Sequence, residues 1–469
     1  MKKSSRKSQP CAMVARLSAT AILAISFADA YAWGNNLEQK ADPAITAAVK
    51  TIKADAIQAD IEKLVSFGTR STLSAQDPDA IAAGHGIGAA REWLKSRFEA
   101  DSQACGGCLD VKTDEFVQES GPRVPQPTTL TNVYAVLKGT DPDWTQRIVL
   151  VTGHYDSRRT DVLDATGDAP GANDDASGTA VSLESAHALA SAAAKLKLRA
   201  TVVFLTVPGE EQGLFGARHF AQMAKQAGWK IEAVLNDDIV GGDRSPGQDA
   251  HVVRVFSEGL PGAADDKELK LIRAVGGEND SRSRELARYV AEIGASYSPG
   301  VKPLMEFRPD RYLRGGDHTA FNDQGYAAVR FTEYRENFNH QHQNPRTENG
   351  AEYGDTLTFV NFDYVARVAR LNATTLAALA AAPAPPAEVK LVTSALDNDS
   401  TLKWQPSGGD ASGYEVLWRL TTAPTWEHVE KTSGTTLTLK VSKDNVIFAV
   451  RAVDPAGHKS LPVEPIPER

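Results

Sequence analysis

The chain has 469 residues, which is long for one hydrophobic core, so two or three domains are expected. Its residues are 42% hydrophobic and 24% charged, as in an ordinary folded protein, which argues against a disordered or fibrous chain. The formal net charge of −9 argues against nucleic acid or an anionic membrane as a partner.

Residues 1–32 have the pattern of a secretory signal peptide. A basic start is followed by the apolar run AILAISFADA and by AYA at 30–32, which fits a small-x-small cleavage site. A membrane anchor is the alternative, but the run is short for a span and no stop-transfer pattern follows. We therefore predict a secreted or periplasmic protein without a membrane span, whose formal charge after cleavage is −13.

Residues 33–130 have a mixed pattern, with helices expected over 57–68 and 86–100. Two cysteines, Cys105 and Cys108, lie close together in the stretch ACGGC. In an oxidising compartment they are expected to form a local disulfide. A redox motif lacks its strand-and-helix context here, and a zinc ribbon lacks its second cysteine pair.

The central part alternates between buried strands and helices. Strands are expected over 147–153, 200–207 and 232–236, and helices from about Ser177, over 213–228 and over 362–382. Such alternation predicts an α/β fold with a mostly parallel central sheet flanked by helices. We assign residues 131–382 to this α/β domain and expect residues 33–130 to pack with it.

The C-terminal part, residues 383–469, is expected to be a small all-β sandwich behind a PAPPAE linker. Short alternating strands are separated by turns, and Trp404, Tyr414 and the stretch AVRAVD resemble a fibronectin type III module. We expect a separate core around Trp404 and Trp418, so that truncation after Ala382 leaves the preceding α/β domain folded and functional. Such a module would bind a surface or a larger substrate; a lid over the active-site mouth is the alternative.

Polar side chains follow each of the three buried strands. His154 follows the first, Glu210 and Glu211 the second, and Asp237 and Asp238 the third. Ligands in open α/β sheets bind beyond the carboxyl ends of the strands, so these side chains should meet in one crevice. The stretch GANDDASG leads from the first strand to a helix N-terminus at the same crevice.

This set of side chains suggests zinc or a similar divalent cation. Histidine and carboxylates without cysteine are suitable ligands, and their number exceeds what one ion needs. Two ions that share a bridging carboxylate would relieve the repulsion between like charges. Taken singly, each residue could instead be an ordinary strand-end histidine, a solvated loop residue, a turn residue or a helix cap.

The motifs GHYDS, GANDDASG, PGEEQGLFGARHF and LNDDIVG resemble those of the secreted bacterial di-zinc aminopeptidases of metallopeptidase family twenty-eight. The resemblance implies release of N-terminal amino acids from peptides and two Zn²⁺ per chain. It also implies a bridging role for Asp174 and a general-base role for Glu210. The implied metal ligands are His154, Asp174, Glu211, Asp238 and His340, with His342 as the alternative to the last.

His340 is preferred because Asn344 stands four residues later, where family members often have an acidic residue. Asp156, two residues after His154, is placed to orient the imidazole and is counted with the catalytic residues. The resemblance puts Asp317 and His318 in the pocket lining but not among the ligands. The remaining histidines are interpreted as structural or solvated: His85, His187, His219, His251, His428 and His458.

Three other functions are compatible with this pattern. A carboxypeptidase acting on dipeptides would use the same metal ligands, and a glutaminyl cyclase-like enzyme shares the fold but typically holds one zinc. A metal-free binding scaffold is the third, although all five ligand positions are filled here.

Overall fold

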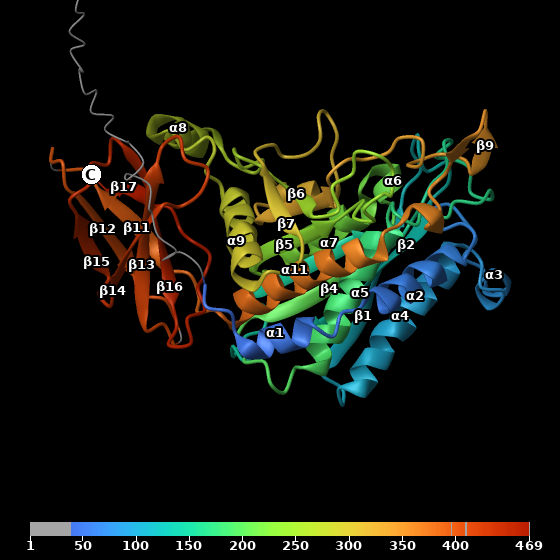
Figure 1. Cartoon of the computed structure of the whole chain (residues 1–469), viewed down its shortest axis with the longest axis horizontal. Helices are drawn as coiled ribbons and strands as arrows, with labels where there is room; N and C mark the ends of the chain where they lie inside the picture. The colour runs from blue at the N-terminus through green and yellow to red at the C-terminus, as the bar shows by residue number, and fades with distance from the viewer. Residues whose placement is uncertain (1–38, 395, 409, 469) are drawn as a thin grey trace, which may run out of the picture. The chain divides into compact units, whose positions relative to one another are not determined.

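The computed structural model describes residues 39–394, 396–408 and 410–468, which belong to one compact unit, Asn36–Arg469 (Figure 1). The predicted signal peptide, residues 1–32, lies outside the described residues. Within the described ranges, no helix combines the length and the apolar character needed to cross a bilayer.

An eight-stranded sheet forms the centre of the catalytic part (Figure 1). Its spatial order is β1-β2-β4-β3-β5-β8-β6-β7, and the four strands β4, β3, β5 and β8 run parallel. The strands are β1 (Leu109–Gln118), β2 (Thr128–Leu137), β3 (Ile148–His154), β4 (Thr201–Val207), β5 (Ile231–Asp237), β6 (Val252–Ser257), β7 (Lys302–Glu306) and β8 (Ala328–Glu333). The three strands predicted over 147–153, 200–207 and 232–236 correspond to β3, β4 and β5, and β3 lies between the other two in the sheet.

Helices cover both faces of this sheet, because its central strands are apolar on both sides. Val149 and Val151 of β3 belong to one core, and Leu150 belongs to the other. The first core is closed by α1 (Pro43–Val49), α2 (Ala54–Val65), α4 (Gly86–Ala104), α5 (Ala176–Ser191), α9 (Arg282–Tyr297) and α11 (Phe362–Ala381). The second core is closed by α7 (Phe215–Gln226) and α10 (Asp317–Asn322).

Smaller elements complete the catalytic part: α3 (Pro78–Ala82), α6 (Glu210–Gly213), α8 (Asp266–Val275), β9 (Arg346–Glu348), β10 (Ala351–Tyr353) and a 3₁₀ turn (Leu357–Phe359). Directly after α4, Cys105 and Cys108 form the predicted local disulfide. The bond closes the turn that leads from α4 into β1.

A buried ionic cluster connects the helices α2, α4 and α5. Arg97 lies 3.5 Å from Asp60, 2.5 Å from Asp101 and 2.9 Å from Glu184. His187 adds a 2.8 Å contact to Asp101, which fits its expected structural role. Burial raises the pKa of Asp60 to about 7, even though Arg97 lowers it.

Asp60→Asn should stabilise the protein at pH 8 and much less at pH 5. Because the folded-state pKa of Asp60 lies above its unfolded value, the native state binds the proton more tightly, and stability is lost as pH rises toward 7. The neutral amide removes that loss, with an expected gain on the order of 1 kcal/mol, or about 2 °C in Tm. Thermal unfolding at both pH values checks this, with exposed Asp55→Asn as the control. Equal Asp60→Asn shifts at pH 5 and pH 8 would contradict it.

The C-terminal strands form two sheets, as the predicted all-β sandwich requires. One has the order β15-β12-β11-β17 and the other β14-β13-β16. The strands are β11 (Ala387–Val392), β12 (Ser400–Gln405), β13 (Gly413–Leu420), β14 (His428–Thr432), β15 (Thr436–Leu439), β16 (Val446–Val453) and β17 (Ile466–Glu468). Trp404 lies in the sandwich core, whereas Trp418 is only partly buried and stacks on His428. The fibronectin type III assignment stays a prediction.

The sandwich is held to α9 by buried polar contacts. Arg451 lies 2.7 Å from Glu292, and the indole nitrogen of Trp426 donates to Glu285 at 2.9 Å. Arg419 pairs with Asp280 just before α9, and Arg288 donates to the carbonyl of Pro424. Separation of the sandwich from the rest of the chain would break these buried ion pairs, and the expectation of a freely detachable module stays a prediction.

Candidate metal centre

The adjacent carboxylates Asp174 and Asp175 serve different purposes. Asp175 caps α5 by accepting the Gly178 amide at 2.9 Å, and it also accepts the amide of His154 at 3.0 Å. A Cβ at Gly178 would lie 2.1 Å from the carbonyl oxygen of Asp237, so only glycine permits this close packing of helix on sheet. The peptide bond between the two aspartates is cis, and the side chain of Asp174 contacts His154 and His342.

Six side chains meet at the carboxyl ends of the central strands, and we call them the candidate centre. They form two groups within which the ligand atoms lie no more than 4.8 Å apart: His154, Glu210 and Asp238, and Asp174, Glu211 and His342. Asp174 connects the two groups. Its Oδ1 lies 3.2 Å from His154 Nε2, and its Oδ2 lies 2.8 Å from His342 Nε2.

The order of the strands places the predicted residues together. His154 ends β3, Glu210 begins α6 just after β4, and Asp238 follows β5, so residues from both neighbouring strands approach His154. Asp238 Oδ1 is 3.9 Å from His154 Nε2. Asp237 instead accepts a hydrogen bond from Asn372 of α11 at 2.9 Å, which fits the choice of Asp238.

The structure brings His342, and not His340, into the candidate centre. His342 Nε2 lies 3.2 Å from Glu211 Oε1. The ring of His340 pairs with Asp243 and stacks on Phe359, with 3.5 Å between ring centroids. Residues two apart in a turn point in different directions, and His342 has a left-handed φ of 57°. The preference for His340 therefore gives way to the alternative, His342.

His342→Ala should lower the zinc content of the protein, whereas His340→Ala should leave it unchanged. Removal of a residue that only hydrogen-bonds to a metal ligand typically lowers metal affinity by roughly 10–100-fold. Removal of a direct ligand such as His342 should lower the affinity by more than that. Zinc content after dialysis against a zinc buffer checks the prediction, with unfolding temperatures to show that both variants fold. Retention of zinc in His342→Ala together with its loss in His340→Ala would restore the original preference.

Asp156 joins the histidine to the glutamate pair. Its Oδ1 lies 3.3 Å from His154 Nδ1, which leaves Nε2 facing Asp174. The same carboxylate accepts the backbone amides of Glu210 and Glu211 at 3.3 and 3.2 Å, and its Oδ2 accepts the hydroxyl of Thr72 at 2.8 Å. This geometry suits the expected orienting role, in which a carboxylate fixes the ring of a metal-binding histidine.

The electrostatics of the centre fit divalent cations. Burial raises the pKa of Glu210 well above its ordinary value, and Asp238 and Glu211 raise it further against the effect of His154. Burial also raises the pKa of Glu211. Within the part of the chain that the structure describes, the buried atoms His154 Nε2 and Glu211 Oε1 have polar neighbours at 3.2 Å but no well-aligned hydrogen-bond partner. Imidazole and carboxylate donors suit zinc, and a shared carboxylate suits two ions.

Several residues at the site carry no motif and were not predicted. Arg330 of β8 lies 2.9 Å from Asp238, and Asp355 accepts the amide of Asp174 at 2.6 Å. Gln341 donates to Asp174 at 3.2 Å, and Arg70 donates to the carbonyl of Gly171 at 2.9 Å. Of these four residues, only Arg330 could have been noticed in the sequence. It lies between apolar residues in a strand, and a charged residue in a buried strand needs a buried partner.

Asp317 and His318 lie at the start of α10 and outside the two ligand groups. Both are buried, and burial raises the pKa of Asp317 to about 7. The His318 ring contacts the carbonyl of Pro309 at 2.8 Å. Elsewhere, His219 stacks on Phe116, and His458 lies between Asp42 and Asp454 at 3.0 Å from each. These contacts fit structural roles.

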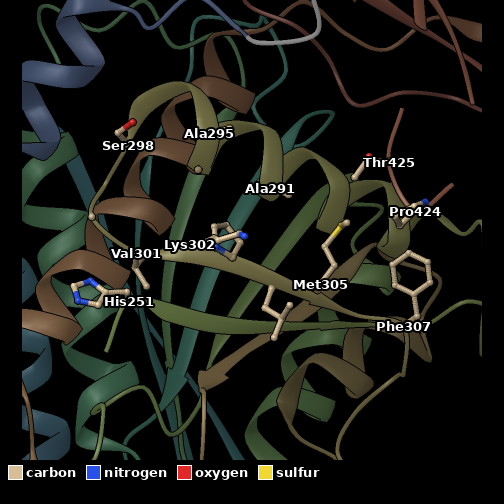
Figure 2. A pocket seen from close by; sticks show the side chains of 14 residues that line it. His251, Ala291, Ala295, Ser298, Val301, Lys302, Met305, Phe307, Pro424 and Thr425 are labelled. Carbon is tan, nitrogen blue, oxygen red and sulfur yellow. The ribbon is translucent and has the colours of Figure 1, made fainter. Parts of the chain in front are cut away.

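The candidate centre opens into a cavity of about 360 Å³. Its wall includes Leu214, Gln341 and four arginines: Arg123, Arg158, Arg311 and Arg314. A larger cavity of about 860 Å³ lies beside α9 and β7, where Met305, Phe307 and Pro424 point into it (Figure 2). No residue of the candidate centre lines that larger space, so the chemistry belongs to the smaller one.

Comparison with known proteins agrees with this geometry. The sequence profile of Peptidase family M28 matches residues 132–365. A probable zinc metalloprotease of Pyrenophora tritici-repentis is 45% identical over 92% of this chain and 88% of its own length. Another, from Leptosphaeria maculans, is 46% identical over 90% of this chain and 97% of its own length.

The fold also resembles solved structures. The LapA aminopeptidase of Legionella pneumophila has a TM-score of 0.50 at 20% identity, over 72% of this chain and 74% of that one. LapB of the same organism has a TM-score of 0.50 at 18% identity, over 72% of this chain and 78% of that one. At these identities the likeness shows the fold, and it confirms the predicted α/β class.

Proposed function

This chain belongs to peptidase family M28 and is a zinc metalloprotease, and we propose that it is an aminopeptidase that releases N-terminal amino acids from peptides. The observation that carries the proposal is the position of Asp174 between His154 and His342, with a carboxylate oxygen facing each imidazole. This arrangement suits a two-ion site of the kind found in co-catalytic peptidases.

The residues divide into two ligand sets around the shared Asp174. His154 and Asp238 would hold one zinc, and Glu211 and His342 would hold the other. Bound zinc supplies a water of lowered pKa and polarises the carbonyl of the scissile bond. Glu210 accepts the proton of the attacking water and passes it to the leaving amine. Asp156 holds the His154 ring in the orientation that presents Nε2.

The size of the cavity supports an exopeptidase. A space of about 360 Å³ is of a suitable size for one or two residues at a chain end. A carboxypeptidase acting on dipeptides is the second candidate, because four arginines line the same cavity and are suited to a carboxylate.

Hydrolysis of a small substrate panel tests the proposal. We expect cleavage of leucyl amide, little cleavage of N-acetyl-leucyl amide, loss of activity with a chelator and recovery on addition of zinc. Equal cleavage of the free and the blocked substrates would contradict an aminopeptidase. Cleavage of N-acetylated dipeptides with a free carboxylate would instead favour the carboxypeptidase.

We also propose that the enzyme acts outside the cytoplasm. The signal-like pattern of residues 1–32 and the Cys105–Cys108 disulfide support this location. N-terminal sequencing of protein recovered from the extracytoplasmic fraction should find a start near residue 33. Recovery of the protein only from the cytoplasm, with residues 1–32 intact, would contradict it.

A further inference from the structure

The wall of the cavity is rich in arginine for a site built on carboxylates. Arg123 comes from the loop between β1 and β2, Arg158 from the loop after β3, and Arg311 and Arg314 from the loop between β7 and α10. We call these four residues the arginine wall. The acidic residues lining the same cavity all belong to the candidate centre: Asp174, Glu210, Glu211 and Asp238.

Arg123 and Arg158 lie beside Glu211, and carboxylates neutralise little of their positive charge. Arg123 is exposed, donates to the backbone carbonyl of Glu211 at 2.8 Å and forms no ion pair with a described carboxylate. The Arg158 guanidinium is fixed by the carbonyls of Arg159 and Thr160, both at 3.0 Å. Its one ion pair within the described residues is with Glu211 at 3.9 Å. Glu211 is itself a proposed metal ligand.

The other two members share their carboxylate partners with further arginines. Glu336 lies 3.1 Å from Arg311 and 2.8 Å from Arg314, and it also pairs with Arg254 at 3.2 Å. Asp310 pairs with Arg311 and with the buried Arg330. Cations therefore outnumber carboxylates on this side of the cavity.

The arginine wall would not be needed to neutralise the centre once metal is bound. Two divalent ions carry four positive charges, which match the four carboxylates that line the cavity. With the carboxylates neutralised in this way, the guanidinium groups give one side of the cavity a net positive charge. Arginine presents a planar fork of donors that matches a carboxylate, and such charge-assisted hydrogen bonds are among the stronger ones in proteins.

We propose that the arginine wall, with Arg123 and Arg158 as its main contacts, binds a carboxylate of the substrate next to the scissile bond. The inference rests on the proposed peptidase function and adds a substrate class to it. The carboxylate belongs either to the C-terminus of a dipeptide or to an acidic side chain of a longer peptide. The two sources present the same chemistry to the guanidinium groups.

Two matched substrate pairs distinguish these sources. Leu-Ala against Leu-Ala-amide tests the terminal carboxylate, and Leu-Glu-amide against Leu-Gln-amide tests the side chain. The wild-type enzyme should prefer the charged member of at least one pair by about 10-fold or more in kcat/KM, as expected for hydrogen bonds to a charged group. The pair that responds identifies the source of the carboxylate. Equal efficiency within both pairs would overturn the proposal.

Variants assign the preference to the arginine wall. In the Arg123→Gln/Arg158→Gln double variant the ratio of kcat/KM for the charged member to kcat/KM for the neutral member should fall to about 1, whatever happens to the efficiency on the neutral member itself. The Arg123→Lys/Arg158→Lys double variant keeps the positive charges but lacks the paired donors of the guanidinium group. Its preference for the charged substrate should lie between those of the wild type and the Gln double variant. Arg273→Gln, an exposed position on α8, is the control for net charge and should keep the wild-type ratio. An unchanged ratio in the Gln double variant would contradict the assignment.

A binding measurement separates this inference from the proposed function. Calorimetry with a dipeptide analogue whose scissile amide is reduced to CH₂–NH, as free acid and as carboxamide, needs no turnover. The free acid should bind the wild type more tightly, and the double variant should lose that difference. Failure of the proposed function would instead show as no chelator-sensitive cleavage of any neutral substrate. Equal binding of both analogues by the wild type would overturn the carboxylate site.

Discussion

Glu210→Gln should lower kcat by about 10²–10⁴-fold and leave the zinc content unchanged, because general acid–base catalysis contributes roughly that much in rate. The amide has the shape of the carboxylate but cannot accept the proton of the attacking water. The backbone of Glu210 is held by Asp156 at 3.3 Å, and this contact does not depend on the side chain. The substitution should therefore leave α6 in place.

Glu211→Gln is the matched comparison, because it changes the adjacent glutamate in the same way. Glu211 lies 3.2 Å from His342 in the second ligand group, so its replacement should weaken zinc binding as well as activity. Steady-state kinetics and zinc content of both variants separate the two roles. If Glu210→Gln lost zinc while Glu211→Gln kept it, the assignments would have to be exchanged. Near wild-type turnover of Glu210→Gln would exclude it as the base.

Much of the candidate centre could be predicted because it follows regular strands. Apolar runs locate the ends of β3, β4 and β5, and the rule that ligands gather at strand ends brings His154, Glu211 and Asp238 together. The order of strands in a sheet cannot be predicted from the sequence of any one strand. In the structure β3 lies between β4 and β5, so the residues at the ends of all three strands are close together. Asp174 was chosen through the resemblance to the family motif, because its position before α5 does not distinguish it from Asp175, which caps the helix.

The choice between His340 and His342 could not be predicted in this way. The two residues lie in an irregular segment between β8 and β9, where no periodicity relates sequence spacing to side-chain direction. The structure decides between them through contacts with Asp243 and Glu211, which are distant in sequence. Asp355 was missed for the same reason, since its partners are the backbone amides of Asn173 and Asp174.

The attachment of the sandwich was hidden by a misleading pattern. Glu415 and Arg419 share one face of β13, Arg451 is the charged residue of β16, and charged side chains on a strand suggest a face in water. In the structure all three are buried. Alternation identifies the two faces of a strand but does not show whether the polar face meets solvent or another part of the chain.

Removal of residues 383–469 should therefore destabilise the catalytic domain by several kcal/mol. Leu461 is part of the main hydrophobic core, and loss of one such side chain alone typically costs about 2–5 kcal/mol. Truncation also uncovers Tyr289 of α9, whose hydroxyl donates to the Lys459 carbonyl at 3.1 Å. Thermal unfolding of the truncated and full-length chains, both loaded with zinc, checks this. Equal unfolding temperatures would support the original idea of an independent module.

A point variant tests the same interface without deleting a domain. Arg451 is buried between Glu292 at 2.7 Å and Glu415 at 2.8 Å, so Arg451→Ala should cost about 3 kcal/mol by removing the nearest cation from both carboxylates, which keep the longer contacts to Lys459 at 3.6 and 3.3 Å. Lys431 also pairs with Glu415, at 3.8 Å, but its side chain is 75% exposed. Lys431→Ala should therefore cost less than about 1 kcal/mol. Denaturant unfolding of both variants measures the difference. If Arg451→Ala were as mild as Lys431→Ala, the contact between sandwich and α9 would contribute little to stability, and the module would be separable after all.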